Sequence, residues 1–227
     1  MKSPIVAANW KMNLTIEEGL ELVKQVLDDS SSDDSEIIFF PPYIALSAIS
    51  GELKNTEYKV GIQNIHHEKS GAYTGEISAE MVKFLDVQYA IIGHSERRLY
   101  FNETDSDVNN KLNRLLDNEI IPVLCFGESL EQRSEGSYLE YVKTQINEGL
   151  KGVRKDKVNK LVLAYEPIWA IGSGKLPSSE EINAIHFYIK DIVQSIAEIE
   201  AISVIYGGSV NCENAKSFFQ QTNIDGA

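Results

Sequence analysis

The stretch Ile5-Val6-Ala7-Ala8-Asn9-Trp10-Lys11-Met12-Asn13 decides between the folds open to this chain. It begins as an apolar run typical of a buried strand and passes into polar residues without any glycine. A dinucleotide-binding sheet carries Gly-x-Gly-x-x-Gly directly after its first strand, where the glycines let the backbone approach a pyrophosphate. The sequence therefore disfavours an open doubly wound sheet, although its alternating strands and helices still predict an α/β fold with a parallel sheet.

Apolar runs of this kind recur along the whole chain at near-regular spacing. They are Ile5–Ala8, Ile37–Phe40, Tyr58–Ile62, Tyr89–Ile92, Pro122–Phe126, Leu161–Tyr165, Ile202–Tyr206, and the beginning of a last run at 223–227. Most are continuously apolar rather than alternating, which is typical of parallel strands buried on both faces. Eight runs favour a closed (β/α)8 barrel, and we expect residues 1–227 to form one domain.

Helical periodicity fills most of the gaps between these runs. Thr15-x-x-Glu18 predicts a capping box at the first helix. The predicted helical stripes are Ile16, Leu20, Val23 and Leu27; Val108, Leu112, Leu115 and Leu116, with Asp105 or Ser106 as cap; Tyr138, Tyr141, Val142, Gln145 and Ile146; and Ile185, Ile189, Ile192, Val193 and Ile196, which follow Ser178 and Ser179.

Composition excludes several classes of protein. The chain has 227 residues, with 21 basic and 34 acidic side chains and a formal charge of −13, which argues against nucleic acid as the main partner. Binding of a small anionic ligand remains compatible with this charge, because such a ligand responds to the local electrostatic field and not to the net charge. Two cysteines cannot form a disulfide framework, and no apolar run approaches the ~18 residues of a membrane span. We expect a cytoplasmic protein without a membrane or nucleic-acid partner.

Polar residues gather at the ends of the predicted strands. They are Asn9, Lys11, Gln63, Asn64, His94-Ser95-Glu96-Arg97-Arg98, Glu128, Glu166 and Gly207-Gly208-Ser209. In a (β/α)8 barrel all these ends lie on one face, where active sites are built. A single polar residue after a strand is usually a helix cap. Six strand ends that converge on one barrel mouth instead predict a catalytic site.

These residues stand in motifs that resemble one family throughout the chain. The matching segments are Ala8-Asn9-Trp10-Lys11-Met12-Asn13, Gly71-Ala72-Tyr73-Thr74-Gly75-Glu76, Gly93-His94-Ser95-Glu96-Arg97-Arg98, Ala164-Tyr165-Glu166-Pro167-Ile168-Trp169-Ala170-Ile171-Gly172-Ser173-Gly174-Lys175 and Tyr206-Gly207-Gly208-Ser209-Val210. In this order they resemble the triosephosphate isomerase family. The resemblance implies a TIM barrel that interconverts dihydroxyacetone phosphate and D-glyceraldehyde 3-phosphate through an enediolate, in glycolysis and gluconeogenesis.

The resemblance also implies roles for two residues that would move and stabilise charge. Glu166 matches the family's base, which takes the carbon-bound proton. His94 matches its electrophile, a neutral imidazole that polarises the carbonyl oxygen. Taken alone, a glutamate before proline is more often a strand-end carboxylate, and a single histidine can be structural. The motifs around them favour catalysis.

Three further residues are expected beside these two. Lys11 would stabilise the developing oxyanion and attract the dianionic substrate, and Asn9 would orient it and donate to substrate oxygens. Glu96 matches a family carboxylate that contacts the lysine and assists proton transfer. From the residues alone, an ion pair of Glu96 with Arg97 or Arg98 is an equal alternative.

The substrate phosphate is expected to bind backbone N–H groups, because glycine lets the chain approach closely. The expected donors are Gly172 and Ser209, which follows Gly207-Gly208. A loop gate would exclude water during the reaction, and it comprises Pro167, Ile168, Trp169, Ala170, Ile171, Gly172, Ser173, Gly174 and Lys175. Trp169 would act as its latch, with Glu128 as the acceptor of the indole N–H.

Partners follow from the resemblance in the same way. Thr74 matches a loop that the family inserts into the partner subunit's site, and Gln63 would lie near that interface, so a homodimer is expected. No metal or organic cofactor is needed, and the expected substrate is a small phosphorylated triose.

The sequence departs from the family pattern at its end. The family continues through strand 8, a Gly-Gly pair that binds phosphate and a last helix, whereas the chain stops at Asp225-Gly226-Ala227. We therefore expect a C-terminally truncated barrel that lacks most of strand 8 and the last helix, and is poorly stable and nearly inactive by itself. Two alternatives stay open: another phosphate-binding barrel isomerase, and a non-catalytic binding module.

Overall fold

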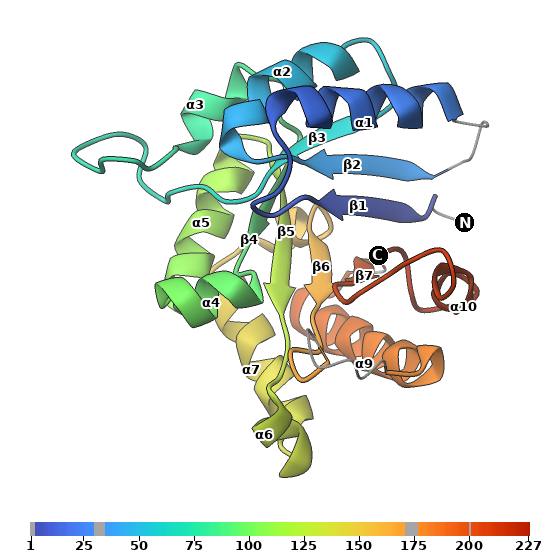
Figure 1. Ribbon diagram of the computed structural model, residues 1–227. Coiled ribbons are helices and arrows are strands. Elements are labelled where there is room, and N and C mark those ends of the chain that lie inside the picture. Colours follow the sequence, from blue (N-terminus) through green and yellow to red (C-terminus); the bar gives the residue numbers. More distant parts are fainter. Residues whose placement is uncertain (1–2, 30–34, 171–176, 200) are drawn as a thin grey trace.

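The computed structural model describes residues 3–29, 35–170, 177–199 and 201–227. Seven parallel strands form one sheet in chain order. They are β1 (Ile5–Asn9), β2 (Glu36–Phe40), β3 (Lys59–Ile62), β4 (Tyr89–Ile92), β5 (Ile121–Phe126), β6 (Val162–Tyr165) and β7 (Ser203–Tyr206). The sheet curves into a nearly closed barrel with helices around it (Figure 1), so the prediction of a TIM barrel is confirmed.

The helices connect successive strands and cover the outside of the barrel. They are α1 (Ile16–Asp29), α2 (Tyr43–Leu53), α3 (Ala79–Lys83), α4 (Ser95–Phe101), α5 (Asp105–Asp117), α6 (Leu130–Ser134), α7 (Tyr138–Leu150), α8 (Lys155–Val158), α9 (Ser179–Ala197) and α10 (Ala215–Phe219). No helix in the described part of the chain is both long and apolar enough to cross a bilayer.

Side-chain caps fix where several of these helices begin. The Thr15 backbone N–H donates to Glu18 Oε2 at 2.8 Å and Glu18 N–H donates to Thr15 Oγ1 at 3.3 Å, as predicted. Ser178 caps α9. The predicted cap of α5 was wrong by one or two residues: Thr104 accepts from the Asp107 N–H and completes a capping box. Asp105 and Ser106 instead lie within the first turn of α5.

Residues Asp225–Ala227 occupy the position of an eighth strand between β7 and β1. The N–H of Ile5 donates to the carbonyl of Asp225 at 2.9 Å, and that of Ala7 donates to Ala227 at 2.8 Å. On the other side, Asp225 N–H donates to Val204 and Tyr206 N–H donates to Gly226, both at 2.9 Å. The two ends of the sheet therefore meet through these three residues.

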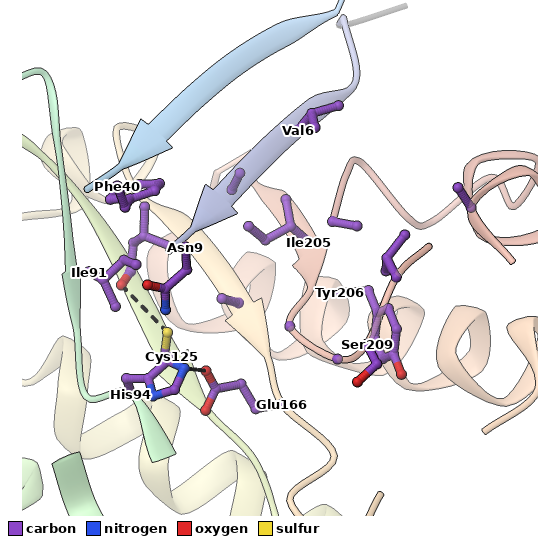
Figure 2. A pocket seen from close by; sticks show the side chains of 18 of the residues that line it. Val6, Asn9, Phe40, Ile91, His94, Cys125, Glu166, Ile205, Tyr206 and Ser209 are labelled. Carbon is purple, nitrogen blue, oxygen red and sulfur yellow. Dashed lines mark hydrogen bonds and ion pairs between the residues drawn. The ribbon is translucent and has the colours of Figure 1, made fainter. Parts of the chain in front are cut away.

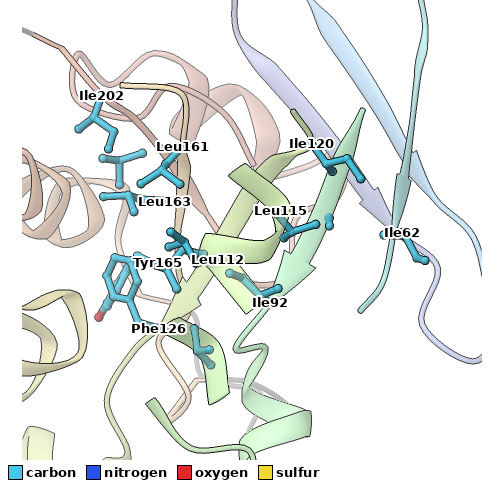
Figure 3. Close-up of a cluster of buried hydrophobic side chains, with 14 of the residues drawn as sticks. Ile62, Ile92, Leu112, Leu115, Ile120, Phe126, Leu161, Leu163, Tyr165 and Ile202 are labelled. Carbon is cyan, nitrogen blue, oxygen red and sulfur yellow. The ribbon is translucent and has the colours of Figure 1, made fainter. Parts of the chain in front are cut away.

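The strands are apolar on both faces because each face packs into a different hydrophobic core. One core fills the barrel interior and contains Val123 and Cys125 of β5. The other lies between barrel and helices and contains Leu124 and Phe126 of the same strand. Figure 3 shows this outer core, to which α5 contributes Leu112 and Leu115 and β6 contributes Leu163 and Tyr165. The alternation along β5 places Cys125 in the barrel interior, below the carboxyl ends of the strands.

Candidate active site

A cavity of about 680 Å³ opens at the carboxyl ends of the strands. Most of the residues expected to bind substrate or catalyse line it: Asn9, Lys11, His94, Glu166 and Ser209. Figure 2 labels Asn9, His94, Glu166 and Ser209 at this cavity. Asn9 ends β1, whereas the other four follow β1, β4, β6 and β7. Strand ends far apart in the sequence thus converge on one mouth. Among the described residues, no group of three or more His, Cys, Asp or Glu side chains could hold a metal ion.

Glu166 reaches the cavity from a nearly buried position. The residue is only 2% exposed. Its Oε2 accepts a hydrogen bond of 2.8 Å from the Ser95 backbone N–H, and its Oε1 lies 3.2 Å from His94 Nε2 (Figure 2). Both of these partners lie in the turn after β4. This places a nearly buried carboxylate directly beside an imidazole at the cavity.

His94 is held by the helix that it begins. It is the N-cap of α4, and its Nδ1 accepts a hydrogen bond of 3.2 Å from the Glu96 backbone N–H. A nitrogen that accepts carries no proton, so this bond assigns the proton of the neutral ring to Nε2. The Nε2–H group faces Glu166 and is the polar group of the ring that can polarise a ligand oxygen.

Lys11 stands at the cavity in an unusual backbone conformation. Its φ is 53°, in the left-handed region that non-glycine residues seldom adopt. Two side chains hold this backbone: Lys11 N–H donates to Asn9 Oδ1 at 3.0 Å, and Gln63 Nε2 donates to the Lys11 carbonyl at 2.8 Å. The ammonium Nζ lies 2.6 Å from Glu96 Oε1. Of the two pairings open for Glu96, the structure shows the one with lysine.

Glu128 forms the centre of a second, deeper cluster. Its carboxylate is fully buried and accepts from the Tyr165 hydroxyl and from Trp169 Nε1, each at 2.9 Å. Arg133 lies 3.4 Å from the same carboxylate. Burial raises the pKa of Glu128, although these hydrogen bonds and Arg133 act in the opposite direction. The expectation that Glu128 accepts the indole N–H is confirmed.

The remaining expected residues either do not line this cavity or lie outside the residues that the structure describes. Pro167, Ile168, Trp169 and Ala170 are described, whereas Ile171, Gly172, Ser173, Gly174 and Lys175 lie outside the described residues. Thr74 is exposed on the segment between β3 and α3, which protrudes from the barrel (Figure 1). Gln63, expected near a subunit interface, bonds the backbone of Lys11 and also donates to the carbonyl of Phe40 at 2.9 Å.

Sequence reasoning assigned no role at this site to Cys125, which lines the cavity from the barrel interior. Burial raises the pKa of its thiol, and the neighbouring charge of Glu166 raises it further, so the thiol stays neutral. The available signal was the alternation along β5, which directs Cys125 to the same side as Val123. That pattern alone does not say which strand end lies over it.

Comparison with known proteins agrees with this geometry. A family model described as triosephosphate isomerase matches residues 4–227. The chain belongs to the triosephosphate isomerase family. The members of this family are isomerases, and the match to the family extends over residues 4–227 of the chain.

Curated relatives carry the same family name. The chain is 44% identical over 230 residues to triosephosphate isomerase of Alkaliphilus metalliredigens, strain QYMF. It is 47% identical over 231 residues to that of Clostridium botulinum, strain Loch Maree, type A3. It is 43% identical over 231 residues to that of Dictyoglomus turgidum, strain DSM 6724. Each alignment covers 100% of this chain and 93% of the relative.

Proposed function

We propose that the chain interconverts dihydroxyacetone phosphate and D-glyceraldehyde 3-phosphate, a step of glycolysis and gluconeogenesis in the cytoplasm. The observation that carries the proposal is the buried Glu166 carboxylate 3.2 Å from His94 Nε2, in a cavity with Lys11 at its mouth. A base, a neutral donor and a cation are the three groups that proton transfer beside a carbonyl requires. Membership of the family supports the same conclusion.

The reaction moves one proton between two neighbouring carbons and one proton between their oxygens, and it leaves the charge of the enzyme unchanged. Glu166 takes a proton from the carbon beside the carbonyl, the C–H electron pair forms the enediolate double bond, and the carbonyl oxygen becomes an oxyanion. The Nε2–H of His94 and the ammonium of Lys11 stabilise that oxyanion. His94 Nε2 gives its proton to that oxyanion and takes the proton of the hydroxyl on the adjacent carbon. The oxygen of that hydroxyl becomes the new carbonyl as protonated Glu166 returns its proton to the former carbonyl carbon. In this scheme substrate atoms replace the direct contact between His94 and Glu166.

The proposed function also requires a site that binds the substrate phosphate. Ser209 follows Gly207 and Gly208 at the cavity wall, where backbone N–H groups suit an anion. Gly172 would supply a second N–H, and the segment 167–175 would close over the substrate, with the Trp169–Glu128 bond holding its first residues in one state. Asn9 and Glu96 would orient Lys11, in agreement with the bonds each makes to it.

The direct test is turnover by the purified chain. We expect slow but measurable conversion of glyceraldehyde 3-phosphate to dihydroxyacetone phosphate, because the base and the donor already face each other. In deuterated water the product should carry solvent deuterium on carbon, since Glu166 exchanges its proton while the enediolate lives. Conversion of another phosphorylated sugar alone would favour a different barrel isomerase. Binding of substrate without turnover or exchange would favour a binding module.

We also propose that the chain forms one domain and assembles as a homodimer. The pairing of residues 225–227 with both β7 and β1 supports one domain. The dimer is supported by large apolar side chains on one part of the surface: Met12 is 95% exposed, Ile44 75% and Phe84 93%. They lie near the start of α1, in α2 and after α3, close to the protruding segment that carries Thr74 (Figure 1). A second copy would cover them.

Sedimentation equilibrium tests the dimer. We expect twice the chain mass at micromolar concentration, and a shift towards one chain mass for Phe84→Glu, because a carboxylate would be buried in the apolar interface. Phe187→Glu on α9 is the matched control, since Phe187 is also exposed but lies outside this surface. A single chain mass for the unaltered protein contradicts the proposal.

A further inference from the structure

We propose that Arg98 is a positioning residue, which holds the backbone of Gly93 so that the His94 ring faces the reacting atoms. The inference rests on the proposed function, where His94 is the electrophile. It goes beyond that function because Arg98 is not among the residues that line the cavity. Its contacts are with the backbone of the turn that carries His94 and of the strand beside it.

Both backbone polar groups of Gly93 are hydrogen-bonded to side chains. Arg98 Nε donates to the Gly93 carbonyl at 2.7 Å, and Gly93 N–H donates to Glu103 Oε1 at 3.1 Å. The backbone of Gly93 has φ +71°, so it is in the left-handed region that favours glycine. A Cβ at this position would lie 2.9 Å from Arg98 Nη2. The guanidinium therefore packs directly against the glycine.

Arg98 also joins the turn to the neighbouring strand. Its Nη2 donates to the carbonyl of Cys125 at 3.4 Å, and its Nη1 pairs with Asp105. Only 15% of its side chain is exposed, so these bonds form largely away from water. One guanidinium thus ties the end of β4, the interior strand β5 and the start of α5 together. The planar fork of arginine can reach two carbonyls and a carboxylate at once, which the single ammonium of lysine cannot.

The grip acts on His94 because His94 is the next residue and begins α4. The Gly93 carbonyl, to which Arg98 donates, belongs to the peptide unit that joins Gly93 to His94, and His94 continues from it with φ −53° and ψ 140°. Its ring is then fixed by the Glu96 N–H, which belongs to the first turn of the same helix as Arg98. A rotation of the Gly93 peptide would swing Nε2 away from its place beside Glu166. A displacement of about 1 Å at a catalytic group can cost roughly 100-fold in rate.

The adjacent residue, Arg97, makes contacts that differ from those of Arg98. Arg97 Nε donates to Glu103 Oε2 at 2.6 Å, and Lys111 Nζ lies 3.1 Å from the same oxygen. Arg97 therefore reaches the backbone of the turn only through the Glu103 carboxylate, which accepts from Gly93 N–H. Arg98 makes its two backbone bonds directly, to Gly93 immediately after β4 and to Cys125 in β5.

A double-mutant cycle with His94 tests the proposal. We expect Arg98→Met to lower kcat by about 10- to 100-fold with little change in KM, because the donor acts on the developing oxyanion. In a His94→Gln background, where the imidazole is gone, Arg98→Met should lower kcat by less than about threefold, since residues that act as a unit are non-additive. Arg98→Lys should restore part of the loss.

Two further measurements distinguish a loss of His94 positioning from a loss of stability. They also distinguish a failure of this inference from a failure of the proposed function. Asp105→Asn breaks the same ion pair but leaves the carbonyl bonds, so it should lower the melting temperature with kcat within about threefold of the unaltered protein. The ring nitrogen resonances of His94, recorded without substrate, should move in Arg98→Lys and not in Asp105→Asn. Equal losses of kcat in both His94 backgrounds, or unmoved resonances in Arg98→Lys, would overturn the inference. A chain without isomerase activity but with the expected resonance shifts would overturn only the proposed function.

Discussion

Replacing Glu166 by aspartate should lower kcat by 100-fold or more. The substitution withdraws the carboxylate by about 1 Å, and proton transfer from carbon tolerates misplacement on that scale poorly. Charge and hydrogen-bonding capacity are retained, so the Ser95 N–H and His94 Nε2 still have an acceptor within the same buried space. Steady-state turnover of glyceraldehyde 3-phosphate, with melting temperature recorded beside it, measures both effects.

The same substitution at Glu180 provides the matched control. Glu180 is exposed in the first turn of α9, away from the cavity, and Glu180→Asp should leave kcat unchanged. If Glu166→Asp keeps near-full activity, Glu166 is not the base. If it loses activity only together with a large fall in melting temperature, the carboxylate is structural.

Replacing Gly127 by alanine should strongly destabilise the chain. The new Cβ would lie 1.7 Å from the carbonyl oxygen of Glu166 and 2.6 Å from its carbonyl carbon. These atoms belong to the backbone, so no side-chain rotation can relieve the overlap, and the residues after β5 and β6 must move apart. Overpacking costs about 1–3 kcal/mol in ordinary cores. A loss of about 3 kcal/mol corresponds to a fall of roughly 6–12 °C in melting temperature for a chain of this size.

Gly51 offers a control with the same chemical change. It lies in α2, and a Cβ added there would have no neighbouring heavy atom within 4 Å, so the methyl group meets only open space. Gly51→Ala should stabilise the helix by about 0.5–1 kcal/mol. Thermal unfolding of the two variants should therefore shift in opposite directions. A Gly127→Ala variant that melts with the unaltered protein would show that the two strand ends are not in close contact.

The strands were predictable because burial on both faces leaves a continuous apolar signal in the sequence. The run Tyr89–Ile92 coincides with β4, and Leu161–Tyr165 exceeds β6 by one residue at its start. Short helices carry no such signal. A five-residue helix such as α3 or α6 completes barely more than one turn, too little for a 3.6-residue period to appear.

The site was predictable as a set of strand ends, but its contacts were not. Lys11 and Glu96 are 85 positions apart, and Ser95 and Glu166 are 71 apart, so only the closed barrel brings them together. The support of Lys11 by Gln63 follows from the curvature between β1 and β3, which no local pattern encodes. The cap at Thr104 was missed because three neighbouring residues could each have capped the helix, and backbone geometry chooses among them.

The left-handed backbone of Lys11 sets stability against function at one position. A side chain in that conformation costs roughly 1–2 kcal/mol relative to an ordinary one, whereas glycine adopts it without strain. Glycine would therefore suit the turn better, but it would remove the ammonium that faces Glu96. A search for thermostable variants that screens only for folding would select against lysine here. The presence of lysine at this position is therefore explained by the role of its ammonium at the cavity and not by the stability of the turn.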